Sequence, residues 1–189
     1  MKALRAKIAQ LTLKLLVLQK WESISIDMIC KALKLSKKKI PKHIKSKNDL
    51  LKNLNKYFDD CLLVKIKSVE KSSSRDMIFE IFMLRFDLLN CYRNSILKIF
   101  KVFKKSPNNF ILLLPSFITS IELIAKSSNI KTENIIGNMK LKILLIIYFS
   151  TFLTWAKDES SSLDKTMTVL DNYLERAESV LKFFKLKNG

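Results

Sequence analysis

Side chains that can contact phosphate groups crowd one short stretch near the N-terminus. Residues 34–47 contain seven lysines and the only histidine of the chain, His43. Lysine ammonium groups neutralise phosphates and release counterions, so this cluster predicts binding to a polyanion. Arginine and asparagine read base edges more distinctively than lysine does, and residues 37–44 contain neither. The chemistry predicted for this stretch is therefore phosphate contact more than base reading.

Positive charge is concentrated in the first third of the chain. Residues 1–67 hold 17 Lys and Arg against 5 Asp and Glu, a net charge of +12 out of +18 for all 189 residues. Lysine, isoleucine and asparagine are used heavily everywhere, which accounts for much of the total charge but not for the asymmetry. A basic N-terminal module indicates a nucleic acid or an anionic membrane surface as partner.

The glycine content argues against several classes of catalytic motif. The chain has two glycines, Gly137 and the terminal Gly189. Phosphate-cradling loops and hydrolase nucleophile elbows need several glycines, so neither motif can occur in a chain with one internal glycine. His43 has no cysteine, second histidine or nucleophile signature nearby, which argues against a metal ligand or a catalytic role. We expect no enzyme activity, no cofactor and no metal site.

The cysteines and the C-terminal acidic residues fit structural roles. Three cysteines lie far apart in the sequence: Cys30, Cys61 and Cys91. This spacing predicts reduced thiols of a cytoplasmic protein rather than a disulfide framework or a metal knuckle. Four carboxylates surround an expected helix break: Asp158, Glu159, Asp164 and Asp171. We expect them to cap helices and face solvent.

Apolar residues recur at steps of three and four along most of the chain, which is the spacing of one helix face. No alternating apolar run is bounded by turn residues, so no strand is expected. The predicted fold is all-α with about nine helices, and Pro115 should kink or restart the helix that contains it. The predicted ranges are 3–19, 26–33, 37–44, 47–68, 75–90, 92–104, 110–127, 138–157 and 163–184.

Three serines mark helix starts around the basic stretch. Ser25 and Ser36 are expected to cap two short helices, and Ser46 the long helix that follows. Asp49, three residues after Ser46, completes a capping-box pattern. Two short helices joined by a tight turn form a helix-turn-helix, whose second helix enters the major groove of DNA. We therefore predict a helix-turn-helix in this part of the chain.

The stretch from Ser25 to Leu51 resembles the DNA-binding pattern of the TetR family of transcriptional regulators. That pattern contains Thr-x-x-x-Ile-Ala, Gly-Val-Ser, Leu-Tyr-x-His-Phe and Lys-x-x-Leu, in this order. The residues that match it are Ser25, Ile29, Leu35, Ser36, Ile40, His43, Ile44, Lys47 and Leu50. Two later stretches, 75–87 and 155–171, resemble segments of alphaproteobacterial TetR-like proteins, so the resemblance spans most of the chain.

The resemblance implies the TetR fold and a homodimeric, cytoplasmic regulator that binds duplex DNA. It implies a helix-turn-helix domain over residues 1–47, a connecting helix over 48–68 and a helical ligand and dimerisation domain over 69–189. The residues expected to contact DNA are Ser25, Ser36, Lys37, Lys38, Lys39, Lys42, His43 and Lys47.

Two residues depart from the family pattern. Lys34 stands where the family has a turn glycine, and a left-handed backbone there costs a non-glycine residue on the order of 1 kcal/mol. Pro41 stands where the family has a tyrosine that contacts phosphate. As the fifth helical residue after Ser36, Pro41 removes one backbone hydrogen bond and is expected to kink the second helix.

The middle and last helices are expected to hold an effector pocket and a dimer interface. The middle helices of TetR-like proteins enclose a ligand, which predicts an apolar pocket around Phe82, Phe86, Phe103 and Phe117; plain core packing is the alternative. The last two helices are apolar beyond one face, which suits a two-fold four-helix interface or burial within the monomer. The expected interface residues are Leu141, Leu145, Tyr148, Phe152, Leu170 and Leu174.

A second function fits the same fold. An accessory protein of ubiquinone biosynthesis shares the TetR fold and binds isoprenoid lipid rather than DNA. Trp21, the altered turn at Lys34 and the late Trp-x-x-Asp-x-Ser segment that begins at Trp155 also resemble that group. No transmembrane segment is expected, because the most apolar run, from Ile143 to Leu153, is shorter than the roughly 20 residues that span a bilayer.

Overall fold

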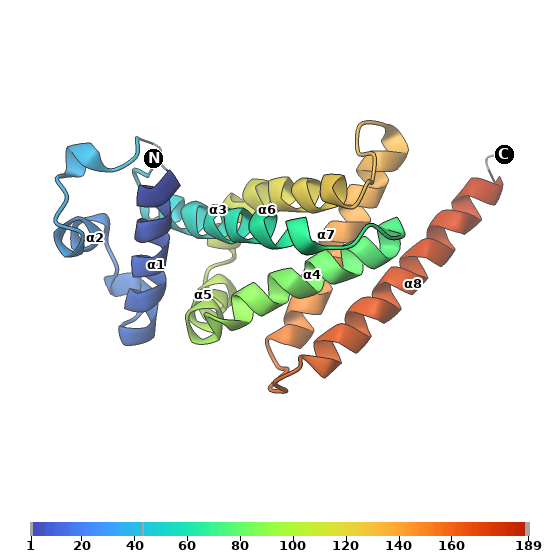
Figure 1. Ribbon diagram of the computed structural model, residues 1–189. Helices are drawn as coiled ribbons and strands as arrows, with labels where there is room; N and C mark the ends of the chain where they lie inside the picture. Colours follow the sequence, from blue (N-terminus) through green and yellow to red (C-terminus); the bar gives the residue numbers. More distant parts are fainter. Residues whose placement is uncertain (1, 43, 188–189) are drawn as a thin grey trace. The chain divides into compact units, whose positions relative to one another are not determined.

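The computed structural model describes residues 2–42 and 44–187, with the side chains of Lys37 and of residues 180–187 outside the described set. Within this part of the chain the fold is all-α and contains no strand. Its α-helices are α1 (Lys2–Leu18), α2 (Ile26–Ala32), α3 (Lys47–Lys65), α4 (Ser74–Asn90), α5 (Arg93–Lys105), α6 (Pro107–Ser127), α7 (Ile135–Trp155) and α8 (Asp164–Lys187), as Figure 1 shows. Short 3-10 turns follow α1, α2 and α3: η1 (Trp21–Ser23), η2 (Lys37–Lys39) and η3 (Ile66–Ser68).

The helix starts around the basic stretch follow from local sequence. The Ser25 hydroxyl accepts a hydrogen bond from the Met28 backbone N–H at 3.2 Å and caps α2. At the start of α3, Asp49 Oδ2 accepts from the backbone N–H groups of Lys45 and Ser46 at 3.1 and 2.9 Å. Ser46 Oγ accepts from the Asp49 N–H at 3.3 Å in return. The predicted cap and capping box are confirmed.

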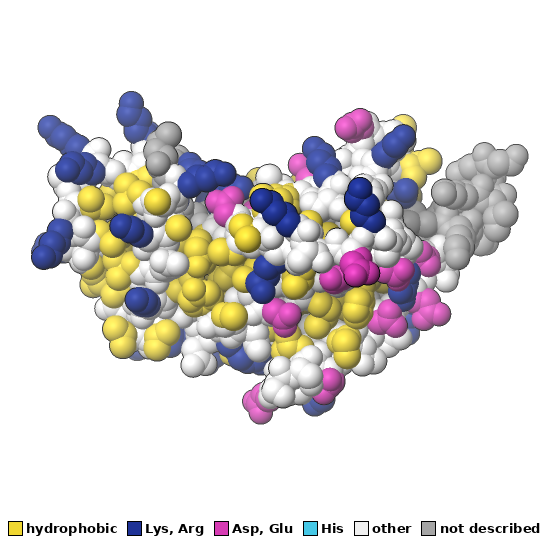
Figure 2. All heavy atoms as spheres, in the orientation of Figure 1, with side chains coloured by type: hydrophobic (Ala, Val, Ile, Leu, Met, Phe, Trp, Pro, Cys, Tyr) yellow, Lys and Arg dark blue, Asp and Glu magenta, His cyan; other side chains and the backbone are white. Residues whose placement is uncertain are grey.

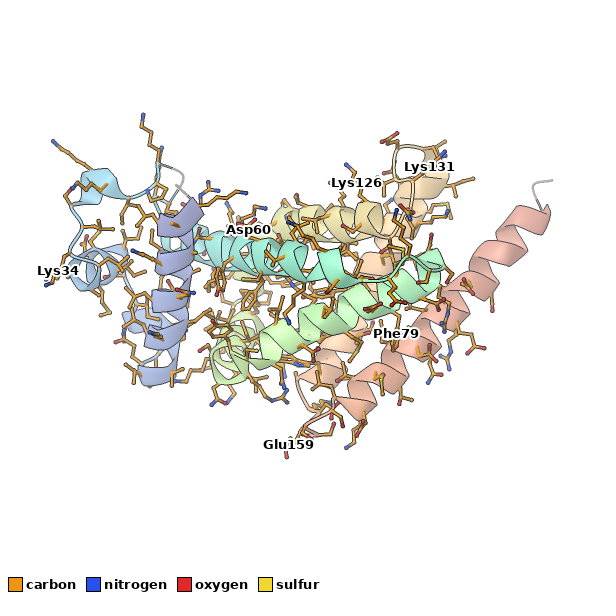
Figure 3. All side chains as sticks on the ribbon, viewed as in Figure 1. Lys34, Asp60, Phe79, Lys126, Lys131 and Glu159 are labelled. Atoms are coloured by element: carbon orange, nitrogen blue, oxygen red, sulfur yellow. The ribbon has the colours of Figure 1, made fainter. Side chains whose placement is uncertain are left out.

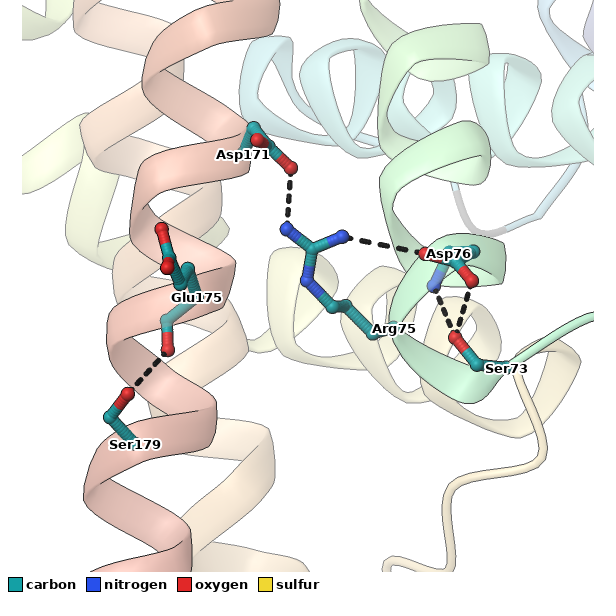
Figure 4. A network of polar contacts seen from close by, with 6 residues as sticks. All are labelled: Ser73, Arg75, Asp76, Asp171, Glu175 and Ser179. Carbon is teal, nitrogen blue, oxygen red and sulfur yellow. Dashed lines mark hydrogen bonds and ion pairs between the residues drawn. The ribbon is translucent and has the colours of Figure 1, made fainter.

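The later helices start within three residues of the predicted positions. α4 begins at Ser74, one residue before the predicted start, and Ser73 caps it, because Ser73 Oγ accepts from the Asp76 backbone N–H at 3.1 Å (Figure 4). α6 begins at Pro107, where the missing N–H has no intrahelical partner to lose. Pro115 lies inside α6, which continues to Ser127, so the helix does not restart at this proline, and the kink stays a prediction.

One predicted helix is absent from the described backbone, which therefore has eight α-helices rather than about nine. Among the described residues of this range, 37–42 and 44, Lys37–Lys39 form a 3-10 turn in place of the predicted second helix. The prediction of an α-helix over 37–44 is wrong. Pro41 accounts for the difference, because proline beyond the first helical turn removes a hydrogen bond and clashes with the preceding turn.

The chain forms two compact units, and each is described on its own. Unit 1 contains the residues up to Val64 and Leu88–Ser120. Helices α1 and α5 pack together in it, and the Ser95 hydroxyl donates a hydrogen bond to Leu13 O at 2.8 Å. The inward face of α3 is buried, with Phe58 at 2% exposure. Unit 1 thus joins the helix-turn-helix region to α3, α5 and the first part of α6.

Unit 2 contains Lys65–Asp87 and the residues from Ile121 onward. Helices α7 and α8 pack side by side in this unit. Its core stacks aromatic rings, with the Phe86 and Tyr148 ring centroids 5.5 Å apart and their planes inclined by 16°. Phe82, Phe86 and Trp155 have no exposed surface. These large rings fill the interior between α4 and α7.

Acidic residues connect the helices of unit 2. Asp158 is 1% exposed, and its Oδ2 accepts from the Thr166 backbone N–H at 2.8 Å and the Thr166 hydroxyl at 2.7 Å. It caps α8 as predicted, but the expectation that it faces solvent is wrong. Asp171 of α8 accepts from Arg75 of α4 at 2.5 Å (Figure 4). Asp171 therefore joins two helices rather than capping one.

Two helices, α6 and α7, are long and apolar enough to cross a membrane by length and composition alone. Helix α7 begins at Ile135 and has 21 residues, so it extends well beyond the apolar run that the sequence singles out. Core helices of soluble proteins share these properties. Length and composition therefore give weak support for a membrane span.

Candidate nucleic-acid interface

The turn after α2 has the left-handed backbone that the sequence predicts. Lys34 has φ 52°, in the region that favours glycine. The Leu35 N–H donates to Cys30 O at 2.9 Å, and the Lys34 N–H donates to Lys31 O at 3.1 Å. This pair of bonds is a Schellman ending, which fixes the direction in which the chain leaves α2. A lysine thus forms this left-handed turn at the position where the TetR pattern has glycine.

The segment that follows the turn does not continue as an α-helix. The Lys39 N–H donates to Ser36 O at 2.9 Å, and the Ile44 N–H donates to Pro41 O at 2.8 Å. Both bonds span three residues, as in isolated turns. Pro41 has no N–H for the Lys37 carbonyl, and its ring disfavours helical backbone at Ile40. The result is two short turns in place of one regular helix.

Apolar side chains nevertheless fix this segment to unit 1. Ile40 and Ile44 are 9% and 3% exposed, and Pro41 is buried with them. A surface groove of about 580 Å³ lies between this segment and the start of α2. Its lining includes Ile24, Ile40 and Ile44 as well as charged side chains such as Asp27. The basic segment is therefore anchored by its isoleucines although it lacks helical hydrogen bonds.

The charged side chains of the segment point into solvent. The exposed lysines are Lys34, Lys38, Lys39, Lys42 and Lys45. Figure 3 labels Lys34, which extends away from the ribbon, and Figure 2 shows dark blue side chains projecting from the same region of unit 1. We call these five residues the lysine surface. Their ammonium groups are accessible to phosphates.

Lys47 lies in a different environment from the lysine surface. Its Nζ donates to the backbone carbonyl of Glu22 at 2.8 Å and lies 4.9 Å from the centroid of the Trp21 ring. Burial lowers the pKa of Lys47, and the nearby Glu22 carboxylate opposes this effect. The ammonium ties the start of α3 to η1 through a cation–π contact and a hydrogen bond. The predicted DNA contact thus has an intramolecular partner.

The remaining predicted DNA contacts divide into two groups. Ser25 and Ser36 are exposed, and Ser25 uses its hydroxyl to cap α2. The side chains of Lys37 and His43 lie outside the described residues. Lys34 and Lys45 were not among the predicted contacts, but they are exposed like Lys38 and Lys42 and belong to the lysine surface. A helical wheel assigns exposure only along a regular helix, and this segment is not one.

The four aromatic residues predicted to line one pocket fall in different units. Phe82 and Phe86 belong to the filled core of unit 2. Phe103 and Phe117 are half-buried in unit 1, and each packs against Phe110, with ring centroids 5.8 and 6.0 Å apart. Each pair has a packing role, and a shared pocket remains a prediction.

The predicted dimer residues divide evenly by exposure. Tyr148, Leu170 and Leu174 are at most 5% exposed and belong to the core of unit 2. The half-buried residues are Leu141, Leu145 and Phe152. Three further apolar side chains of α7 and α8 are more exposed, Ile146 at 65%, Leu153 at 51% and Met167 at 40%. A groove of about 460 Å³ lies on this surface, lined by Ser150, Leu153, Thr154, Lys157, Lys165 and Tyr173.

Comparison with known proteins shows the class of fold. No protein-family model and no curated protein matches the chain. Among solved structures, a TetR transcriptional regulator from Nitrosomonas europaea ATCC 19718 superposes with a TM-score of 0.72 at 18% sequence identity. The match covers 93% of this chain and 98% of that one. The protein therefore has the TetR-like fold, and the resemblance seen in the sequence is confirmed at the level of the fold.

Proposed function

We propose that the protein is a homodimeric, cytoplasmic TetR-like transcriptional regulator that binds duplex DNA through the lysine surface. The observation that carries this proposal is the exposure of Lys34, Lys38, Lys39, Lys42 and Lys45 on a segment anchored by buried isoleucines. Like charges on a fixed segment repel one another, so the lysines do not stabilise the folded segment by themselves. A phosphate backbone offers the complementary charge at close spacing.

The missing second helix determines which kind of DNA contact is proposed. A regular recognition helix would present side chains to base edges at fixed positions in the major groove. The described part of this segment, residues 37–42 and 44, offers no such helical face, whereas phosphate contacts depend mainly on accessible charge. Binding should therefore be strongly salt-dependent and weakly sequence-dependent.

The dimer part of the proposal rests on unit 2. The exposed side chains of Ile146, Leu153 and Met167 on α7 and α8 supply apolar surface for a two-fold contact. The effector would be a small apolar molecule held by the aromatic residues of the middle helices. No group of three or more His, Cys, Asp and Glu side chains among the described residues could hold a metal ion. We propose no enzymatic step.

The experiment is a fluorescence-anisotropy titration of labelled duplex DNA at several salt concentrations. Replacing Lys38 and Lys42 by alanine should weaken binding and reduce the slope of log K against log salt by about one unit per lost contact. Lys126→Ala with Lys131→Ala removes the same charge from unit 2 and should leave the slope unchanged. The proposal fails if no duplex binds at low salt, or if both double variants lose affinity equally.

A second candidate function is an isoprenoid-binding accessory protein that does not bind DNA. The observation in its favour is the single 3-10 turn in place of the recognition helix. Native mass spectrometry of the purified protein with a polyprenol tests it. A retained polyprenol together with no DNA binding at low salt would favour this candidate, and DNA binding without polyprenol would favour the regulator.

A further inference from the structure

The turn between α6 and α7 displays two adjacent isoleucines to solvent. Ile135 and Ile136 open α7 and are 81% and 52% exposed, and Met139 one turn later is 40% exposed. Single exposed apolar side chains are ordinary on protein surfaces, but neighbouring ones at this exposure indicate a contact surface. We call Ile135, Ile136 and Met139 the apolar tip.

Hydrogen bonds order the turn that carries the apolar tip. Asn129 ends α6 with φ 58°, and the Ile130 N–H donates to Ala125 O at 2.9 Å, as in a Schellman motif. Asn134 then caps α7, because its Oδ1 accepts from the Gly137 N–H at 2.6 Å. The isoleucines are thus exposed by a defined backbone and not by a frayed end.

Gly137 allows the turn to pack directly on the first turn of α7. A Cβ atom at this position would lie 2.6 Å from Thr132 Cα and 2.7 Å from Lys131 O. Real Cβ atoms essentially never come so close to backbone atoms, which cannot swing aside as the end of a side chain can. The only internal glycine of the chain therefore lies where it sets the position of the apolar tip.

Positive charge surrounds the apolar tip. Residues 126–142 contain four lysines and one acidic residue, Glu133, a net charge of +3. Lys126, Lys131 and Lys142 are exposed, and Lys140 is half-buried. Figure 3 labels Lys126 at the end of α6 and Lys131 in the turn, and Figure 2 shows dark blue and yellow side chains next to each other there. The surface thus combines apolar and cationic groups.

We propose that the apolar tip docks on an anionic membrane surface, with Ile135 and Ile136 inserted at the interface and the lysines against lipid headgroups. Apolar side chains flanked by lysines match both the acyl boundary and the negative charge of such a surface. A nucleic acid would use the lysines and leave the isoleucines in water. A second copy of this surface would carry the same net charge of +3 and would offer the lysines no opposite charge.

Vesicle flotation with the full chain tests this proposal. Vesicles of phosphatidylcholine with about 30% phosphatidylglycerol should bind the protein, and vesicles of phosphatidylcholine alone should bind it far less. Ile135→Ser with Ile136→Ser should lower the partition coefficient about tenfold, because two apolar side chains are lost from the interface. Ile111→Ser with Leu112→Ser is the matched control, because these residues are 60% and 53% exposed in unit 1, and it should bind as the wild type does.

A tryptophan at the apolar tip gives a second readout that does not depend on affinity. Trp21 and Trp155 are 6% and 0% exposed, so Ile135→Trp adds the solvent-exposed indole. Its emission should shift to the blue on anionic vesicles and be quenched by brominated lipid. Absence of the shift, or equal vesicle binding by the tip variant and the control, would overturn the proposal. So would conversion of a dimer to a monomer by the tip variant without lipid, which would assign this surface to a second copy.

Discussion

In this protein, single side chains connect segments that lie apart in the sequence. The Lys47 ammonium joins α3 to Trp21, and the Asp158 carboxylate reaches from the α7–α8 loop to the start of α8. Asp158 also accepts from the Ser160 hydroxyl at 2.6 Å. Burial raises the pKa of Asp158, but hydrogen bonds from Ser160 and Thr166 outweigh it and lower the pKa to about 2.

The lowered pKa of Asp158 makes stability depend on pH in a defined direction. Because the folded-state pKa lies below the unfolded value, the carboxylate stabilises the fold above about pH 4, and this contribution is lost as the pH falls towards 2. The shift corresponds to about 2 kcal/mol. Urea denaturation should show Asp158→Asn less stable than wild type by about this amount at pH 7, with the difference roughly halved at pH 3. Asp164→Asn, at an exposed carboxylate, is the control, and a gap that does not change with pH would contradict the prediction.

Residue-scale roles were predictable where they depend on sequence neighbours. Ser25, Ser46 and Asp49 bond to groups three or four residues away, so a short pattern identifies them. Asp158 bonds to Thr166 across a loop, and only the folded α7–α8 connection brings the two together. In the same way, only the folded chain brings Lys47 to Trp21, so its intramolecular contact could not be predicted from neighbouring residues.

At the scale of elements, one proline changes the backbone of the segment that we propose to bind DNA. The helix pattern over residues 37–44 is present in the spacing of Ile40 and Ile44, and both side chains are buried as a helix would require. The backbone departs from the helix because Pro41 cannot donate and restricts Ile40. The spacing of apolar residues predicts which side chains face inward. It carries no information about the backbone hydrogen bond that proline cannot make.

Pro41→Ala tests whether this proline alone prevents the second helix. Alanine restores the N–H and has the highest helix propensity, so residues 37–44 should gain helical Cα chemical shifts in NMR spectra. Proline in a helix interior costs about 3 kcal/mol, more than enough to decide the conformation of a two-turn helix. The variant should also show a larger preference for one DNA sequence over another. Unchanged shifts would mean that another residue, such as Lys34, directs the chain out of the helix.

At the scale of the whole molecule, the all-α, TetR-like class was predictable and the outward surface of unit 2 was not. Low glycine content and helical spacing exclude sheets without reference to contacts. Helix α7 is apolar on nearly all sides, so its sequence does not tell which side chains α8 and α4 cover. Packing places Tyr148 in the core and leaves Ile146 and Leu153 outside. The sequence therefore did not separate the buried side chains of α7 from the exposed ones, and the predicted dimer residues stay a prediction.

Glutamate at the outer face of α7 should separate the proposed dimer. Ile146→Glu with Leu153→Glu places two charges on 65% and 51% exposed positions, which a two-fold contact would bury at high cost. Light scattering should report a monomer with unchanged far-UV circular dichroism. Ile111→Glu, at a position of similar exposure in unit 1, should remain dimeric. A double variant that keeps the dimer mass would show that this face does not form the interface.

Gly137 has a consequence for how freely the α6–α7 turn tolerates sequence change. Any side chain at this position would have to displace the backbone of Lys131 and Thr132, whereas Ile135 and Ile136 are 81% and 52% exposed. A library that randomises residues 135–137 and is selected only for folded protein should therefore recover almost any residue at the first two positions and glycine at the third. Folding thus imposes almost no selection on the two isoleucines, so their identities are open to selection by whatever they contact.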